Sequence, residues 1–276
     1  MRFSYTAVWE DTVRLIRAHG SLAAAIAGVF LFLPALVFGH LLPMPTTNDP
    51  NQFFPLIIDH IGRNIHWIAL TAIAGMTGTI AILLLVFRPG LSVGGAVAAG
   101  LALMPFYFVA NFLATFVILG GLVLLFVPGL YLIGRLLPLA ALLVAENRKN
   151  PADAITRTWA LTKGHGWAVL GLFVLIFVAG FILVSVVGGI IGTILALALS
   201  DNLSFFLNQV VSSLLNTALQ VVFIFLYAAV YRALTARTEA VSGADLAKGP
   251  RGPARMTGET DTSAGTGTSE GGGGVA

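Results

Sequence analysis

The chain has 276 residues, of which 57% are hydrophobic and only 10% are charged, and its formal net charge is +3. Soluble domains are usually about a quarter charged, so a water-soluble fold of this length would lack polar surface, and the sequence predicts an all-α polytopic membrane protein. Cysteine is absent, which excludes disulfides, thiolate metal sites and a cysteine nucleophile.

The chain begins with a predicted amphipathic helix. Residues 1–20 form this segment, and within 6–18 the side chains of Trp9, Val13 and Ile16 share one helical face. Arg14 and Arg17 lie on the other face. Such a helix is expected on the cytoplasmic surface of the membrane, with its arginines toward anionic lipid.

Six apolar stretches follow within a domain predicted over 21–235, and each is expected to cross the membrane. They lie at 21–43, 65–87, 104–127, 130–145 and 167–191 and within 205–234. We expect a turn-rich loop over 44–63, a tight turn at Pro128-Gly129 between the third and fourth spans, and a break in the fifth span near Gly188-Gly189.

Between the fourth and fifth spans the sequence predicts a short capped helix. Asn150 is a good N-cap, Pro151 suits the first helical position, Asp153 favours the positive end of the helix dipole, and Gly164 ends the helix. Residues 158–166 align without gaps with residues 12–20, both preceding an apolar span. With a weaker copy near 92, this predicts interfacial helices before spans one, three and five, and it suggests an internal triplication.

Basic residues sort to one side of the six spans, which predicts that both termini are cytoplasmic. Residues 236–276 have almost no apolar side chains in their last part and are expected to form a disordered cytoplasmic tail.

One charged side chain falls inside a predicted span. Arg135 costs at least a few kcal/mol there unless it is paired or reaches water. Four polar residues of the sixth span lie on one helical face, and they are its expected partners: Gln209, Ser213, Asn216 and Gln220. Two interpretations stay open, an outward-open polar cleft that holds an anionic or phosphate head group and a hydrogen-bond network that only fixes packing.

Further basic residues precede the spans and are expected to contact lipid head groups rather than nucleic acid. These are Arg14, Arg17, His19, Arg157, Lys163 and His165. Glu146 is expected to pair with nearby basic residues. The remaining histidines, His40, His60 and His66, lack metal-site spacing, and no phosphate-binding or catalytic motif occurs, so no metal, cofactor or catalytic residue is predicted.

Residues 124–167, LLFVPGLYLIGRLLPLAALLVAENRKNPADAITRTWALTKGHGW, resemble bacterial proteins with the glycerophosphoryl diester phosphodiesterase membrane domain and related six-span families. The resemblance rests on a shared pattern at Pro128, Gly129, Arg135, Glu146, Asp153, Ala154, Trp159, Lys163 and Gly164. It implies a multi-pass protein of the bacterial inner membrane. In fused relatives a separate soluble barrel domain performs the hydrolysis, and because we expect no such domain here, the resemblance implies no phosphodiesterase activity.

Three functions remain open from the sequence. The first is an integral membrane protein that binds, organises or transports lipids or small amphiphiles. The second is a structural or partner-binding subunit, in a homo-oligomer or with another membrane protein. The third is a membrane enzyme acting on phospholipid-derived substrates.

Overall fold

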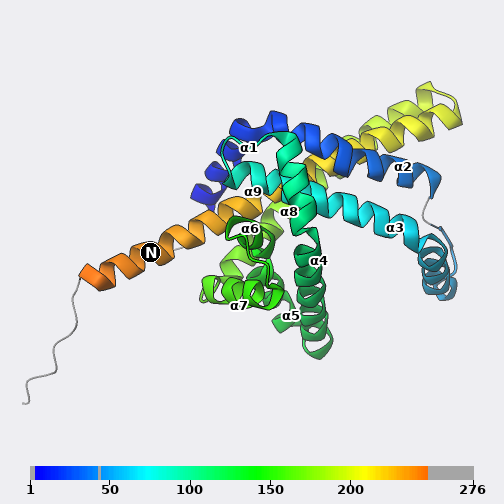
Figure 1. Ribbon diagram of the computed structural model, residues 1–276. Coiled ribbons are helices and arrows are strands. Elements are labelled where there is room, and N and C mark those ends of the chain that lie inside the picture. The colour runs from blue at the N-terminus through cyan, green and yellow to red at the C-terminus, as the bar shows by residue number, and fades with distance from the viewer. Residues whose placement is uncertain (1–3, 43–44, 248–276) are drawn as a thin grey trace, which may run out of the picture. The chain divides into compact units, whose positions relative to one another are not determined.

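The computed structural model describes residues 4–42 and 45–247, with side chains as far as Thr238. The chain consists of two units, Met1–Thr238 and Glu239–Ala276, and the first contains the apolar spans. All regular structure in the described residues is helical. The elements are α1 (Tyr5–Ala27), the π-helix η1 (Gly28–Phe32), α2 (Leu33–Leu41), α3 (Pro50–Phe87), α4 (Val93–Leu124), α5 (Phe126–Leu136), α6 (Leu139–Ala145), α7 (Pro151–Leu161), α8 (Gly166–Ala198) and α9 (Asp201–Ala247) (Figure 1).

Six helical stretches within the described residues are long and apolar enough to cross a membrane. They are Tyr5–Leu41, Pro50–Phe87, Val93–Leu124, Phe126–Ala145, Gly166–Ala198 and Asp201–Thr238. Each overlaps one of the spans expected from the sequence. The prediction of an all-α, multi-pass membrane protein is therefore confirmed.

Two of the expected interfacial segments are continuous with the spans that follow them. Ser4 caps α1, and the helix runs through Gly20 into the first span without a break. Ser92 caps α4 through a hydrogen bond from the Gly95 backbone N–H (3.1 Å), and α4 also continues unbroken. Neither segment ends in a proline or a left-handed glycine, which usually stop helices.

The third interfacial segment, α7, is a separate helix and has the predicted caps. The Asn150 side chain accepts a hydrogen bond from the Ala152 backbone N–H (3.1 Å), and Asp153 lies in the first turn. Gly164 follows the helix with a φ of +79°, a conformation that favours glycine. The chain can therefore reverse between α7 and α8.

The expected loop over 44–63 is wrong from Pro50 onward. Asp49 accepts a hydrogen bond from the Asn51 backbone N–H (2.9 Å) and so caps a helix that begins at Pro50. Aspartate followed by proline is typical of both turns and helix starts. The expected break near Gly188-Gly189 is also wrong, because α8 passes through both glycines without interruption.

The turn between the third and fourth spans lies earlier than predicted. Leu125 is extended (φ −156°, ψ 122°), whereas Pro128 and Gly129 lie in the first turn of α5. A Cβ atom on Gly129 would lie 2.6 Å from the Leu122 Cα atom. Gly129 therefore permits the close approach of α4 and α5 rather than the turn itself.

The C-terminal helix is longer than expected. The backbone of α9 stays helical to Ala247, beyond the boundary at 236 where we expected a disordered tail to begin. Residues 248–276 lie outside the described residues, so disorder there stays a prediction.

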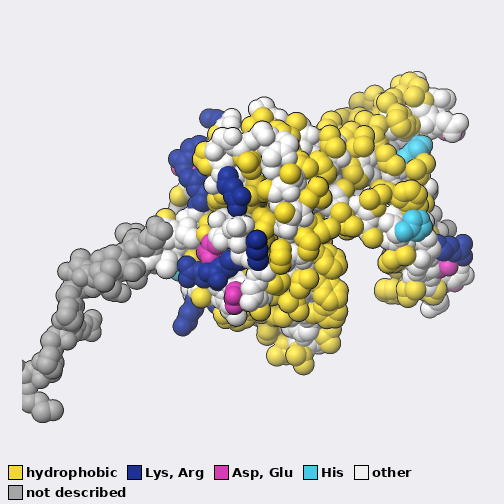
Figure 2. Space-filling model, in the orientation of Figure 1, with side chains coloured by type: hydrophobic (Ala, Val, Ile, Leu, Met, Phe, Trp, Pro, Cys, Tyr) yellow, Lys and Arg dark blue, Asp and Glu magenta, His cyan; other side chains and the backbone are white. Residues whose placement is uncertain are grey.

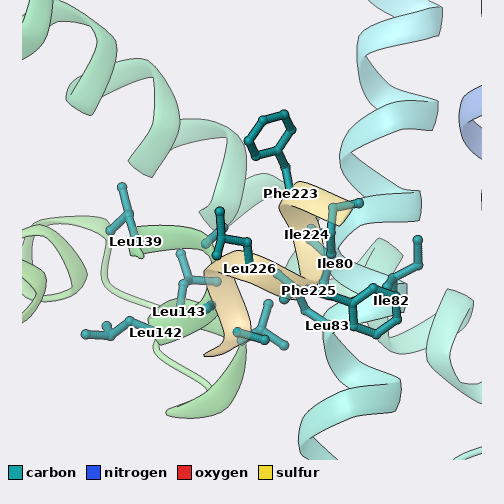
Figure 3. Close-up of a cluster of buried hydrophobic side chains, with 14 of the residues drawn as sticks. Ile80, Ile82, Leu83, Leu139, Leu142, Leu143, Phe223, Ile224, Phe225 and Leu226 are labelled. Carbon is teal, nitrogen blue, oxygen red and sulfur yellow. The ribbon is translucent and has the colours of Figure 1, made fainter. Parts of the chain in front are cut away.

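The core is formed where α3, α6 and α9 meet. Figure 3 shows Ile80, Ile82 and Leu83 of α3 close to Phe225 and Leu226 of α9, with Leu142 and Leu143 of α6 beside them. All of these side chains are buried. Many large apolar side chains of α4 and α8 are instead exposed, as expected for surfaces that contact lipid, among them Phe112, Phe116, Phe181 and Leu197.

Charged side chains are unevenly distributed. Most lysines and arginines gather over the beginning of α1, over α7 and over the later part of α9, whereas His40, His60 and His66 belong to the end of α2 and the first half of α3 (Figure 2). In that half of α3 the described residues include one ion pair, between Arg63 and Asp59 (2.9 Å). This distribution is the one that the positive-inside rule predicts for cytoplasmic termini.

Candidate functional site

Arg135 fastens α5 to the end of α7. The residue is only 6% exposed. Its Nε donates to the Thr162 hydroxyl (3.4 Å), and its Nη2 donates to the Trp159 carbonyl oxygen. The Thr162 oxygen also lies 3.2 Å from the Arg135 carbonyl oxygen, to which its hydroxyl can donate. The Thr162 hydroxyl is also 2.8 Å from the Thr158 carbonyl oxygen, so it is the side chain of Arg135 that ties α5 to the end of α7.

The charge of Arg135 is compensated by a helix end and aromatic rings. The last turn of α7 presents carbonyl groups that have no partner within the helix, at the negative end of its dipole. The guanidinium carbon lies 3.9 Å from the centre of the Trp159 ring and 5.5 Å from that of Tyr131, which permits cation–π attraction. No ion pair joins Arg135 to a carboxylate of the described residues.

The expected pairing of Arg135 with the polar stripe of the sixth span is wrong. Gln209 lies against Gly39 of α2, and Ser213 is buried. Asn216 and Gln220 line cavities to which Arg135 does not contribute. The reason is that α7 folds back onto α5 and satisfies Arg135, so the stripe serves a different part of the molecule.

That part is a cleft between η1, α2, α3, α4 and α9. Its larger cavity has a volume of about 660 Å³. A smaller cavity of about 400 Å³ shares Thr79, Tyr107 and Gln220 with it and adds Asn216 and Tyr227. Because they share these residues, the two cavities together form one cleft.

The cleft has an apolar part and a polar part. Its apolar walls come from η1, α2 and α3 and include Phe30, Leu31, Ala35, Phe38, Ile68, Ala72 and Met76. Its polar part comes from α3, α4 and α9 and consists of Thr79, Tyr107, Asn111, Asn216, Gln220 and Tyr227. Thr71 also lines the larger cavity, but its hydroxyl donates to the Trp67 carbonyl of its own helix (3.0 Å). The polar stripe of the sixth span had indicated two residues of the polar part, Asn216 and Gln220. Tyr107 and Asn111, four residues apart in an apolar span, carried a second signal that the sequence analysis missed.

A π-helical turn forms part of the apolar wall. Phe30 and Leu31 belong to η1, which immediately precedes α2 with Pro34 near its start. Proline lacks the N–H that the α-helical pattern requires, and π-turns are frequent at functional sites. A Cβ atom on Gly78 would lie 2.8 Å from the Phe30 Cβ atom, so glycine lets η1 approach α3 closely.

Two carboxylates organise the basic end of the molecule. Asp11 of α1 pairs with Arg14 and lies 3.6 Å from Arg232 of α9. This cluster joins the first and last spans. The contact between Asp11 and Arg232 was not predicted, because the periodicity of the sequence does not indicate which helices are neighbours.

Glu146 forms the second cluster, as its expected pairing with basic residues predicts. It accepts from Arg148 (2.7 Å) and lies 3.5 Å from Arg157. The Tyr231 hydroxyl donates to it across 3.3 Å. Since Tyr231 and Arg232 are adjacent in α9, the two clusters fix one segment of that helix.

The residues expected to contact lipid head groups remain on the surface. Arg17 and Lys163 are exposed, and His19 is half-buried. Arg14 and Arg157 each share a carboxylate but keep side-chain exposures of 71% and 43%. His165 lies 3.1 Å from Arg237 of α9. The basic surface is therefore available to anionic groups, although two of its arginines are partly neutralised.

No protein-family model, curated protein or solved structure matches the chain. The relationship suggested by residues 124–167 stays a prediction.

Proposed function

We propose that this integral membrane protein binds a lipid or small amphiphile in the cleft. The observation that carries the proposal is the combination of apolar walls with a cluster of hydroxyl and amide groups inside the span region. Ligand cavities of about 300–1,000 Å³ with a few convergent polar groups are the usual size and composition of small-molecule sites. The larger cavity falls within that range.

Gln220 supplies the energetic argument. It lies near the middle of the span Asp201–Thr238, it is exposed to the cleft, and it has no hydrogen bond to another described residue. A primary amide without a partner costs about 1–3 kcal/mol in a protein and more in hydrocarbon. The cleft must therefore supply Gln220 with a polar partner, either water or the polar group of a ligand.

The apolar walls favour an occupant with a hydrocarbon part. Removing apolar surface from water is worth about 25 cal/mol per Å², and walls of phenylalanine, leucine and isoleucine offer such surface over much of the cleft. Water alone would satisfy the amide but would leave these walls hydrated. A molecule with one polar and one apolar end satisfies both parts.

The same proposal places the protein in the bacterial inner membrane with both termini in the cytoplasm. The sorting of Lys and Arg to one end supports this orientation. In it, Arg17 and Lys163 contact anionic head groups at the cytoplasmic surface. Membership of the six-span family suggested by the sequence is part of the proposal.

The test is native mass spectrometry of the protein extracted from membranes, with and without added amphiphile. Ala72 lines the cleft and Ala196 is an exposed residue of α8 outside it. Ala72→Trp should abolish retention of the amphiphile, because the indole fills the apolar part, and Ala196→Trp should not.

Equal retention by the two variants would contradict a ligand in the cleft. A wild-type protein that holds no amphiphile but forms a stable complex with a second protein would favour the partner-binding alternative.

A further inference from the structure

We infer that the cleft selects amphiphiles whose polar end is uncharged and hydrogen-bonding, and discriminates against those whose polar end carries a full charge. The inference rests on the proposed function, since it names the ligand class of the same cleft. It corrects the sequence-based expectation of an anionic head group at an arginine inside the membrane.

The chemistry of the polar part supports a neutral ligand. Its six residues have three hydroxyl groups and three amide groups, none of which carries a charge. The Thr79 hydroxyl already donates to the Gly75 carbonyl (2.8 Å) and the Asn111 amide to the Tyr107 carbonyl (3.1 Å), so these two residues offer mainly acceptor oxygens. No Lys, Arg, Asp or Glu is among the described residues that line the cleft. A hydroxyl, ester or amide of a ligand can pair with such groups, whereas an ion would find no counter-charge.

The buried arginine and the ion-pair clusters described above lie outside the cleft. Arg135 is tied to α7, and the clusters around Asp11 and Glu146 use arginines at the basic end of the molecule. None of these residues lines the cleft. A phosphate, carboxylate or ammonium that entered would lose its water without gaining an ion pair, which is strongly unfavourable at low dielectric.

The titratable histidine of the cleft lies far from its polar part. His60 and Thr79 both line the larger cavity and both belong to α3. Nineteen residues of helix separate them, which corresponds to about 28 Å along the helix at 1.5 Å per residue. His60 therefore stands at the opposite end of an elongated cavity, and the apolar walls between the two residues suit a hydrocarbon chain.

The polar residues are also in position to recognise a group rather than merely to line a wall. Thr79 and Tyr107 are each 8% exposed, so they form a packed floor. Asn216 and Gln220 are exposed above it, and Asn216 donates its Nδ2 to the Ser212 carbonyl (2.8 Å). The Asn216 amide oxygen and both ends of the Gln220 amide therefore have no hydrogen-bond partner among the described residues that line the cleft, and they can accept and donate hydrogen bonds there.

The experiment compares amphiphiles that share one saturated chain and differ only in the polar end. The neutral set is a fatty alcohol, a primary fatty amide and a monoacylglycerol. The charged set is a fatty acid, an alkyl phosphate and an alkylammonium. The full-length protein in phosphatidylcholine nanodiscs is equilibrated with each compound, and the retained compound is measured by native mass spectrometry.

The amount of each compound that the Ala72→Trp protein retains measures the background from the lipid phase. This amount is subtracted from the amount that the other proteins retain. We expect the neutral compounds to be retained at least about tenfold more than the charged ones, which corresponds to about 1.4 kcal/mol. Gln220→Leu should reduce this ratio severalfold. Asn208→Leu, which also replaces an amide by leucine on α9 but lies against Gly192 of α8 and outside the cleft lining, should leave it unchanged.

The outcomes separate the two proposals. Charged compounds retained as well as neutral ones, or an unchanged ratio in a folded Gln220→Leu protein, would overturn the inference and leave the cleft as a ligand site. No retention above the Ala72→Trp background for either set would overturn the proposed function itself. The thermal unfolding temperature of each variant shows whether it is folded.

Discussion

Replacing Arg135 by leucine tests the connection between α5 and α7. The change removes charged hydrogen bonds to the Trp159 carbonyl and the Thr162 hydroxyl, each worth about 1.5–3 kcal/mol, and leaves the carbonyl without its partner. It also removes the cation–π contact, worth about 1–2 kcal/mol. Relief of the desolvated guanidinium offsets part of this loss. We expect a net destabilisation of about 2–4 kcal/mol.

The assay combines thermal unfolding with hydrogen–deuterium exchange of α7. Because the lost contacts lie at the end of α7, exchange should increase in residues 151–162 while the core of α3 and α9 stays protected. Arg63→Leu is the matched control, since Arg63 is 76% exposed in its pair with Asp59. Exposed pairs of this kind contribute about 0–1 kcal/mol.

Two results would refute this reasoning. If Arg135→Leu destabilised the protein no more than Arg63→Leu, Arg135 would not hold α7. If it abolished retention of amphiphiles without changing exchange in α7, Arg135 would act at the ligand, which was one of the two interpretations left open by the sequence.

Three further predictions follow from contacts elsewhere in the chain. Glu146→Gln should destabilise the protein by about 1–3 kcal/mol, measured by thermal unfolding, because the charged partner of two arginines and a tyrosine is lost. Gly129→Ala should cost about 1–3 kcal/mol, because the added Cβ atom would lie 2.6 Å from the backbone of α4, whereas Gly120→Ala, with open space around it, should be neutral or stabilising in the same assay. The chain has no native cysteine, so an impermeant maleimide should label Ser200→Cys in intact cells and Lys149→Cys only after permeabilisation; the reverse labelling would invert the proposed topology.

Most of the fold could be predicted from the lengths of the apolar stretches and from the capping residues. Six apolar stretches predicted the spans because lipid requires about 20 apolar residues for each crossing. Asn150 and Gly164 predicted the ends of α7 for local reasons that no distant contact alters. The start of α3 was missed because Asp49 and Pro50 suit a turn and a helix start equally well.

The site depended on which helices are neighbours, and periodicity does not contain that information. The polar stripe on α9 was predicted to pair with Arg135, whereas its residues Asn216 and Gln220 line the cleft. Their partners on α4, Tyr107 and Asn111, could be seen only as two polar residues in an apolar span. Arg135 was paired with the wrong helix. A buried cation needs a partner, and the sequence does not show that α7 folds back to bring its end to Arg135.

Tyr231 and Arg232, which are adjacent in α9, contact Glu146 and Asp11 respectively. Gln220 and Tyr231 are eleven residues apart, close to three full helical turns, so they share a face about 16 Å apart along the axis. Any sliding or rolling of α9 that moves Gln220 must also pull Tyr231 from Glu146 and Arg232 from Asp11. A ligand that displaced α9 would therefore disturb its contact to α1 through Asp11 and its contact to α7 through the Glu146–Arg157 pair.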